Sequence, residues 1–341
     1  MEFRKEIQEA RFRSPLKGFE EVVQPIEVRY DPLTGRRCRI NVERAKRPKQ
    51  TPKEGIEIST LVKSSEEKCQ FCAGRLESST PKFPSGFPER IRVGEACVFP
   101  NLFPFGGLHA VGIFSSRHFM VLGEISAKLI EDCFSASLQC FELFYRKMPE
   151  LKFWCINWNN LPPGAASIVH PHVQIFADKS PTFFLEELIR ESREYRLRTG
   201  VNYWEDLVRE ERRLGERYLG RTGRVHWLTT FAPQGNREVM GVVEGISSLS
   251  RLRGMLGDFS DGLSRVLKGY NELGVWSITF TTYSGPADEP MEDFYWLNTR
   301  IISRPYPFPF YVSDCGFMEK FHDEPVIETL PEDISCLKKY F

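Results

Sequence analysis

Apolar and polar residues follow two different periods along this chain, and the two periods predict helices and strands. Apolar residues recur at helical spacing over residues 125–147, and shorter apolar runs at 97–101, 109–114 and 153–158 have the length of strands. Residues 167–177 alternate between apolar and polar positions, as in a strand with one buried face. The first half of the chain therefore predicts an α+β fold.

The same order of elements returns in the second half. Predicted strands at 225–231 and 238–243 precede a predicted helix at 249–271, and two further strands follow at 276–283 and 294–304. The order strand–strand–helix–strand–loop–strand thus occurs twice. This predicts a duplicated α+β unit with antiparallel sheets and flanking helices.

The remaining segments complete the predicted organisation. Residues 27–42 alternate around the turn signal Asp31–Gly35, which predicts two short strands, and a polar loop extends from there to about residue 68. The predicted divisions are an irregular N-terminal arm (1–26), a first unit (27–180), a charged helical connector (181–220) and a second unit (221–341). Aligning the units places His170 and His172 against Asn298 and Arg300, so the second unit is predicted to be degenerate.

Composition narrows the class of protein. The 341 residues contain 46 basic and 46 acidic side chains, so net charge predicts attraction to neither nucleic acid nor membranes. The charged N-terminus lacks the apolar core of a signal peptide, and no apolar run approaches the roughly 20 residues of a membrane helix. Nine cysteines, an odd number, favour reduced thiols. We therefore expect a soluble cytoplasmic protein.

The predicted strand at 167–177 carries the most informative polar residues. Because side chains alternate across a strand, His170, His172 and Gln174 would share one face, opposite an apolar face that includes Val173. Two imidazoles on a largely apolar strand are costly without partners. They are either satisfied core histidines or parts of a site. Pro171 lacks an N–H, so the strand should lie at a sheet edge or begin at the proline.

A Cys-x-x-Cys pair, Cys69 and Cys72, offers two thiolates at a spacing that suits one zinc ion. The alternative, a redox pair, normally lies at a helix start after a strand, which these surroundings do not offer. His118 and His170 are the candidates to complete a Cys₂His₂ set, although His118 could equally be a turn residue at the surface. A closed four-ligand site would organise structure rather than activate water.

If His170 binds a metal, His172 remains free to act as a nucleophile. A neutral imidazole attacks phosphorus when its other nitrogen donates to a fixed acceptor. Gln174 would donate to a phosphoryl oxygen. The loop 159–167, rich in small residues and backbone donors, either cradles a diphosphate or is an ordinary turn, which Asn and Ser also favour. Arg44 and Arg47 are either phosphate ligands or solvated surface residues.

These residues resemble a known family. Three segments are similar to the galactose-1-phosphate uridylyltransferases in order and spacing, closely over residues 27–178. They are Arg29-Tyr30-Asp31-Pro32-Leu33-Thr34-Gly35 with Arg44-Ala45-Lys46-Arg47-Pro48, Cys69-x-x-Cys72 with Phe114-Ser115-Ser116-Arg117-His118, and Asn159…Ser167-x-x-His170-Pro171-His172-x-Gln174.

The resemblance implies roles for individual residues. Zinc would be held by Cys69, Cys72, His118 and His170, and His172 would be the nucleophile. The residues implied to contact the nucleotide are Arg44, Arg47, Asn101, Asn159, Ser167 and Gln174. The family belongs to the histidine-triad superfamily. Its members are built from a duplicated α+β unit and are typically dimers, so the resemblance implies a homodimer.

The chain also departs from the family's pattern. Leu102 stands where an acidic residue usually follows the nucleotide-contacting asparagine, here Asn101. Asn298-Thr299-Arg300 replaces a His-x-His pair that binds a second metal in some members, so no iron site is predicted. In the sugar-contacting segment near the C-terminus, residues 313–319 differ from the family, and Glu319 is the candidate for its acidic residue.

The predicted function is nucleotidyl transfer between a nucleotide sugar and a hexose 1-phosphate, in the manner of UDP-glucose–hexose-1-phosphate uridylyltransferases and of galactose metabolism, through a nucleotidyl-histidine. One alternative is an ADP-sugar phosphorylase or adenylyltransferase that uses phosphate as acceptor. Another is a zinc-stabilised nucleotide-binding protein without turnover.

Overall fold

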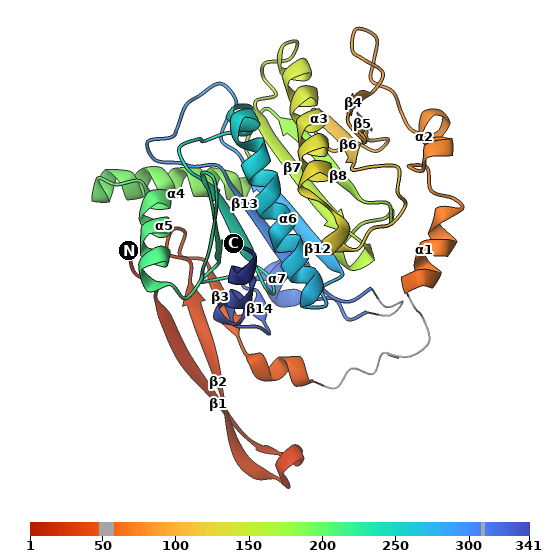
Figure 1. Ribbon diagram of the computed structural model, residues 1–341. Helices are drawn as coiled ribbons and strands as arrows, with labels where there is room; N and C mark the ends of the chain where they lie inside the picture. The colour runs from red at the N-terminus through yellow and green to blue at the C-terminus, as the bar shows by residue number, and fades with distance from the viewer. Residues whose placement is uncertain (48–57, 308–310) are drawn as a thin grey trace.

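Ten strands of the computed structural model form one continuous sheet, which is the centre of the molecule (Figure 1). The structure describes residues 1–47, 58–307 and 311–341; Pro48 and the middle of the predicted loop lie outside them. The strands, in their order across the sheet, are β4 (Ile91–Val93), β5 (Ala96–Pro100), β6 (Leu108–Ile113), β8 (His172–Asp178), β7 (Phe153–Asn160), β12 (Ser277–Tyr283), β13 (Asn298–Arg304), β11 (Val239–Val243), β10 (Val225–Thr229) and β9 (Tyr218–Thr222).

This strand order repeats with a reversal at the middle of the sheet. The order β4-β5-β6-β8-β7 on one side is matched by β9-β10-β11-β13-β12 on the other, and β7 and β12 join the two halves as an antiparallel pair. All neighbouring strands of the sheet are antiparallel. The predicted α+β fold with a duplicated antiparallel unit is confirmed.

Each half contributes one long helix to the same face of the sheet. Helix α3 (Ala127–Tyr145) lies between β6 and β7 in the chain, and α6 (Leu256–Glu272) lies between β11 and β12. Their apolar faces pack against the sheet and each other in one core that includes Phe134, Trp227 and Phe259. The helical period that predicted residues 125–147 and 249–271 arises from this buried stripe, although 249–255 form a 3₁₀ turn before α6 begins.

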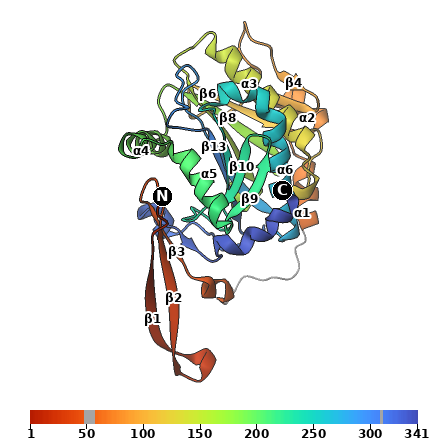
Figure 2. The same ribbon diagram turned by 60° about the vertical axis from the view of Figure 1, so that its left-hand side comes forward.

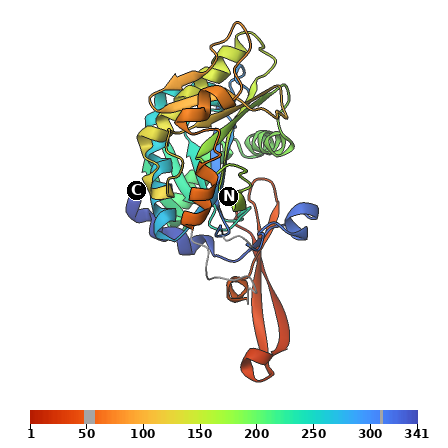
Figure 3. The same ribbon diagram turned by 90° about the vertical axis from the view of Figure 1, so that its right-hand side faces the viewer.

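The opposite face is covered differently in the two halves. Helices α4 (Phe183–Thr199) and α5 (Tyr203–Leu214), in the predicted helical connector, pack on the second half through residues such as Leu188, Trp204 and Met240 (Figures 2 and 3). On the first half, this face carries a smaller cluster with Phe71, Phe99 and Val111. That cluster includes Leu76 of α2 (Ala73–Ser79), whereas the neighbouring α1 (Ile58–Glu66) contributes no residue to it.

The N-terminal segment corrects a prediction. Residues 1–25, expected to be irregular, form most of a long hairpin of β1 (Lys5–Ser14) and β2 (Glu20–Tyr30) that projects from the body (Figure 1). Most of its side chains are exposed on both faces, so no apolar alternation marks it in the sequence. The predicted loop to residue 68 likewise contains α1, which buries none of its residues.

The base of the hairpin belongs to a second, four-stranded sheet. It consists of β1, β2, β3 (Arg37–Ile40) and the short C-terminal strand β14 (Val326–Ile327), which follows α7 (Phe317–Phe321). The predicted turn joins β2 to β3: the Asp31 carboxylate accepts from the backbone N–H groups of Leu33 and Thr34.

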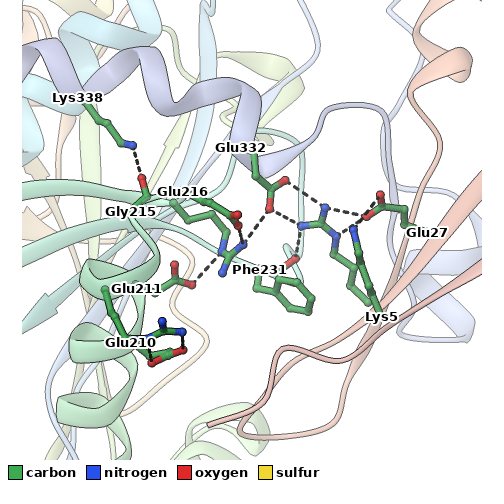
Figure 4. A network of polar contacts seen from close by, with 12 residues as sticks. Lys5, Glu27, Glu210, Glu211, Gly215, Glu216, Phe231, Glu332 and Lys338 are labelled. Atoms are coloured by element: carbon green, nitrogen blue, oxygen red, sulfur yellow. Dashed lines mark hydrogen bonds and ion pairs between the residues drawn. The ribbon is translucent and has the colours of Figure 1, made fainter.

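A buried network of charges fastens this sheet to the second half (Figure 4). Glu332, in the C-terminal 3₁₀ segment Pro331–Tyr340, accepts from Arg29 of β2 and from Arg217, which precedes β9. Arg217 also pairs with Glu211 at the end of α5, at 2.9 Å. Both arginine side chains are almost fully buried, so each needs these partners.

Two further observations bear on the sequence-based expectations. All nine cysteines are free thiols, as predicted. Among the described residues, no helix is both long and apolar enough to span a bilayer.

Candidate functional site

The four predicted metal ligands come together from three separate segments of the first half: the Cys69–Cys72 turn and the segments that carry His118 and His170. The Sγ atoms of Cys69 and Cys72 and the ring nitrogens of His118 and His170 all lie within 4.8 Å of one another. Cys69, His118 and His170 are buried, and Cys72 is partly exposed. Two thiols and two imidazoles are the donor set of a closed tetrahedral zinc site. The residues present therefore fit a divalent metal ion.

The hydrogen bonds around this cluster orient Nδ1 of both histidines toward the cysteine sulfurs. The Nε2–H of His170 donates to the Ser115 carbonyl at 2.8 Å, so its Nδ1 carries a lone pair and faces both sulfurs at 3.8 Å. Ser65 Oγ donates to the Val62 carbonyl, so it accepts from the Nε2–H of His118 at 2.8 Å. Both imidazoles thus present Nδ1 to the cluster, each with its outer N–H held by an oxygen.

The thiols also fit a bound cation. Burial, together with the neighbouring Cys69, raises the pKa of Cys72 to about 11. Two thiolates this close would repel each other, and a divalent ion is the usual means by which proteins stabilise such a pair. Cys69, Cys72, His118 and His170 would hold the ion and thereby fix the position of the His170 backbone.

His172 lies directly beside this cluster with its ring held in the opposite tautomer. Its Nδ1–H donates to the backbone carbonyl of His170 at 2.7 Å, which leaves the Nε2 lone pair without a proton. Burial lowers the pKa of His172, and the ring is therefore neutral near pH 7. The Phe71 ring contacts both imidazoles edge-on, at centroid distances of 6.1 Å (His170) and 5.3 Å (His172). Both imidazoles therefore lie on the side of the sheet that carries Phe71.

The strand that carries these residues is shorter than predicted. It begins at His172, directly after Pro171, and lies between β6 and β7 in the sheet interior. Of the two alternatives that the proline left open, the second is therefore correct. Residues 167–171 precede the strand, so of His170, His172 and Gln174 only the last two lie on one face of it, while Val173 and Ile175 enter the core.

Gln174 is held by a histidine that the sequence analysis left without a role. Its Oε1 lies 3.0 Å from Nε2 of His109, on β6, and the same nitrogen lies 3.1 Å from Nδ2 of Asn101. Asn101 directly follows β5. The structure thus brings two predicted site residues together through His109. The position of His109 on the strand face that carries Val111 and Ile113 was the available signal.

The loop after β7 is strained but its backbone donors are largely used internally. Leu161 and Ala165 have positive φ angles of 63° and 67°, which are uncommon for residues with a Cβ. The N–H groups of Gly164, Ala165 and Ala166 donate to carbonyls of Leu161 and Pro162. These three donors therefore close the turn, and binding of a diphosphate by this loop stays a prediction.

The other predicted substrate residues are placed unevenly. Asn159 lies on β7, partly buried, and Ser167 is exposed in the segment before Pro171. Arg47 forms an ion pair with Glu328 at 3.1 Å. Among the described residues, no hydrogen bond or ion pair joins Arg44 or Arg47 to the group around His172.

Glu319 has a structural role in this structure. One of its carboxylate oxygens accepts from the Gly316 N–H at 2.7 Å, at the start of α7, and the other accepts from the Val326 N–H at 3.0 Å. Both oxygens therefore hold backbone groups of the C-terminal segment. A contact with a sugar stays a prediction.

Two surface hollows lie away from this chemistry. One, of about 560 Å³, is bordered by α5 and by Arg221, His226 and Trp296. The other, of about 700 Å³, lies between the N-terminus, the Asp31–Gly35 turn and α4. Neither hollow is lined by a residue of the metal cluster, by His172 or by Gln174. Neither is therefore part of the site around the proposed nucleophile.

Comparison with known proteins gives the class of fold. The chain superimposes on an ADP-glucose phosphorylase from Arabidopsis thaliana with a TM-score of 0.71 at 18% identity, covering 92% of this chain and 98% of that one. A GalT-like protein from Arabidopsis thaliana gives 0.69 at 17% identity, with coverage of 92% and 98%. A uridylyltransferase gives 0.66 at 16%, with coverage of 92% and 97%.

The chain therefore has the fold of the galactose-1-phosphate uridylyltransferase-like proteins, and the resemblance stated from the sequence is confirmed at the level of the fold. An uncharacterized protein of Archaeoglobus fulgidus is 28% identical over 335 residues, which cover 98% of this chain and 96% of that protein. No protein-family model matches the chain.

Proposed function

We propose that this protein is a nucleotidyltransferase that acts on nucleotide sugars through a covalent nucleotidyl-His172. The observation that carries the proposal is the fixed tautomer of His172: Nδ1–H donates to the His170 carbonyl, and Nε2 is free to attack. The similarity in fold to an ADP-glucose phosphorylase and to a uridylyltransferase supports the same class of reaction.

In the first step, Nε2 of His172 bonds to the α-phosphorus of the nucleotide sugar. The bond between that phosphorus and the bridging oxygen breaks, and a sugar 1-phosphate departs with the electron pair. The ring gains positive charge as the new P–N bond forms, and the His170 carbonyl stabilises it through the Nδ1–H. A metal ion in the Cys₂His₂ cluster would act structurally, since four protein ligands leave no open position.

In the second step, an oxygen of the acceptor attacks the same phosphorus and releases His172. The leaving group of each step is already an anion or a neutral imidazole, so little general-acid help is needed. Gln174 would donate to a non-bridging oxygen of the transferred phosphoryl group in both steps. Positioning by the protein would then supply most of the acceleration.

The intermediate can be trapped directly. Wild-type protein is incubated with UDP-glucose or ADP-glucose labelled at the α-phosphate, without acceptor, and protein-bound label is counted after removal of free nucleotide. We expect label on the wild type and none on His172→Ala. His322→Ala, which removes an exposed imidazole, is the matched control and should be labelled like the wild type. Equal labelling of His172→Ala would overturn the assignment.

The acceptor distinguishes the candidate activities. Galactose 1-phosphate or another hexose 1-phosphate should discharge the label as a new nucleotide sugar if the protein is a uridylyltransferase-like enzyme. Discharge by inorganic phosphate as a nucleoside diphosphate would identify an ADP-sugar phosphorylase type. Binding of nucleotide sugars without any label would identify a zinc-stabilised binding protein without turnover.

A further inference from the structure

His109 occupies a position from which it controls the side chain beside the proposed nucleophile. It is 5% exposed, lies on β6, and pairs across the strands with Phe176 of β8. Gln174 is two residues from Phe176, so His109 and Gln174 are diagonal neighbours on one face of the sheet. The ring of Phe105 covers His109 at a centroid distance of 4.0 Å.

One nitrogen of His109 faces two groups, and it cannot form a hydrogen bond with both at the same time. Nε2 lies 3.0 Å from Oε1 of Gln174, which only accepts, and 3.1 Å from Nδ2 of Asn101, which only donates. The amide of Asn101 is fixed in this orientation because its Oδ1 accepts from the Phe103 N–H at 2.9 Å. A protonated Nε2 therefore holds Gln174, and an unprotonated Nε2 holds Asn101.

The other ring nitrogen decides between these states. Nδ1 of His109 is buried and has no hydrogen-bond partner in the described structure. If Nε2 were the acceptor, the neutral ring would carry its proton on Nδ1 and bury an unsatisfied N–H. Orphaned buried N–H groups are rarer in proteins than orphaned acceptors. The ring therefore favours the Nε2–H form, which holds Gln174 and leaves the Asn101 amide hydrogens for a ligand.

The degenerate half uses the matching position in another way. Gln174 and Arg300 are each the third residue of a seven-residue strand, β8 and β13, so Arg300 corresponds to Gln174 and not, as the sequence alignment predicted, to His172. Arg300 is bound by Glu238, directly before β11, at 3.1 Å. If the β11–β13 register is continued by one residue, Glu238 and Arg300 are also diagonal neighbours. Both halves thus fix the third residue of this strand from the adjacent strand, by a neutral hydrogen bond in one and by a buried ion pair in the other.

We infer that His109 is a positioning residue for the transfer reaction: its Nε2–H holds the carbonyl of the Gln174 amide, so that the NH₂ group points at the phosphoryl oxygens, and it releases Asn101 to bind the nucleotide. This inference rests on the proposed function for its catalytic consequence. The tautomer that it requires is a property of the protein alone.

Two variants separate the hydrogen bond from mere packing. His109→Leu keeps an apolar side chain under Phe105 but removes the donor, whereas His109→Gln places an amide N–H where Nε2 lay. We expect His109→Leu to acquire the nucleotidyl label about 10- to 100-fold more slowly in a single turnover. Without the hydrogen bond, the Gln174 amide is less precisely oriented toward the phosphoryl group. His109→Gln should recover most of the rate.

The affinity for the nucleotide sugar is measured separately, with each variant combined with His172→Ala to prevent turnover. Dissociation constants should change less than about threefold, since Gln174 acts mainly on the transition state. In a Gln174→Leu background, His109→Leu should cause no further loss. Equal labelling rates for the wild type and His109→Leu, or equal defects in His109→Leu and His109→Gln, would overturn the inference while leaving the proposed function intact.

A second readout does not depend on activity. Long-range ¹H–¹⁵N correlation spectra of histidine-labelled protein report which ring nitrogen carries the proton, and the signal is assigned by its loss in His109→Gln. We expect the Nε2–H tautomer. The Nδ1–H tautomer would overturn the inference even if the wild-type protein acquires the nucleotidyl label from the nucleotide sugar. If the wild type acquires no nucleotidyl label, the proposed function is overturned, and with it the catalytic role of His109.

Discussion

His170 and His172 show how two identical side chains, two positions apart, are given different chemistry. His170 donates from Nε2 to Ser115 and turns Nδ1 toward the cysteines, whereas His172 donates from Nδ1 to the His170 carbonyl and keeps Nε2 free. The acceptors decide each tautomer. A single backbone carbonyl, that of His170, therefore links the metal cluster to the proposed nucleophile.

Gly164, in the loop between β7 and His170, has too little space around it for a side chain. A Cβ on Gly164 would lie 2.5 Å from the backbone carbonyl oxygen of Ile278, on β12. Backbone cannot yield as a flexible side chain can, so Gly164→Ala should lower the free energy of unfolding by about 1–3 kcal/mol. Urea titration followed by tryptophan fluorescence measures this loss.

Gly74→Ala is the matched control for that variant. Gly74 lies in α2, where an added Cβ meets nothing within 4 Å, so the change should be neutral or stabilising by up to about 1 kcal/mol. If the two alanine variants were equally stable, the close approach of the loop to β12 would be refuted.

At the scale of elements, α1 and α2 have little apolar packing that would hold them against the body. Helix α1 buries none of its residues and α2 buries only Leu76, so apolar packing contributes little to holding this segment. Cys69 and Cys72 lie between the two helices, and their partners His118 and His170 belong to the body. A metal ion would cross-link the segment to the sheet.

Removal of the metal should therefore loosen this segment first. We expect about one zinc per chain by elemental analysis. A strong chelator, or Cys72→Ser, should lower the melting temperature and open the 58–79 region to proteolysis before the rest of the protein unfolds. Cys336→Ser, at an exposed thiol, should retain the metal and the melting temperature of the wild type. Unchanged metal content in Cys72→Ser would exclude the proposed ligand set.

At the scale of the whole molecule, the two halves differ in what covers one face of the sheet. The face of the sheet that carries His172 and Gln174 in the first half is covered in the second half by α4 and α5. There, Arg300 is buried and bound by Glu238, with Phe184 of α4 beside its guanidinium. The same face of the sheet thus carries the proposed nucleophile in the first half and is covered by two helices in the second.

The pair in the second half should be important for stability and not for transfer. Arg300→Met leaves the buried Glu238 without its cation and should cost about 3–5 kcal/mol in unfolding free energy. The double variant Arg300→Met/Glu238→Gln should be markedly more stable than the single one, because no unpaired charge remains. Denaturant titrations of the wild type, Arg300→Met, Glu238→Gln and the double variant measure this coupling, and a loss below about 1 kcal/mol in Arg300→Met would contradict the stabilising role.

Several parts of this structure were predictable from local sequence. The strands β7 and β12 and the helix α3 bury one regular face each, and β5 is a short apolar run buried on both faces, so these patterns were visible in the sequence. The hairpin of residues 5–30 was not, because it projects from the body and has no buried stripe. The contacts of His109 with Asn101 and Gln174 were not predictable either, because these partners lie on two other segments.

The sequence by itself determined the α+β duplication and the four candidate ligands, because apolar periods and ligand spacing are local properties of a chain. Only the tertiary structure decided which nitrogen of each histidine is free, that β8 lies in the sheet interior, and that Glu319 holds backbone groups of its own segment. Those outcomes depend on acceptors and strands supplied by residues distant in the chain, whose positions follow from packing.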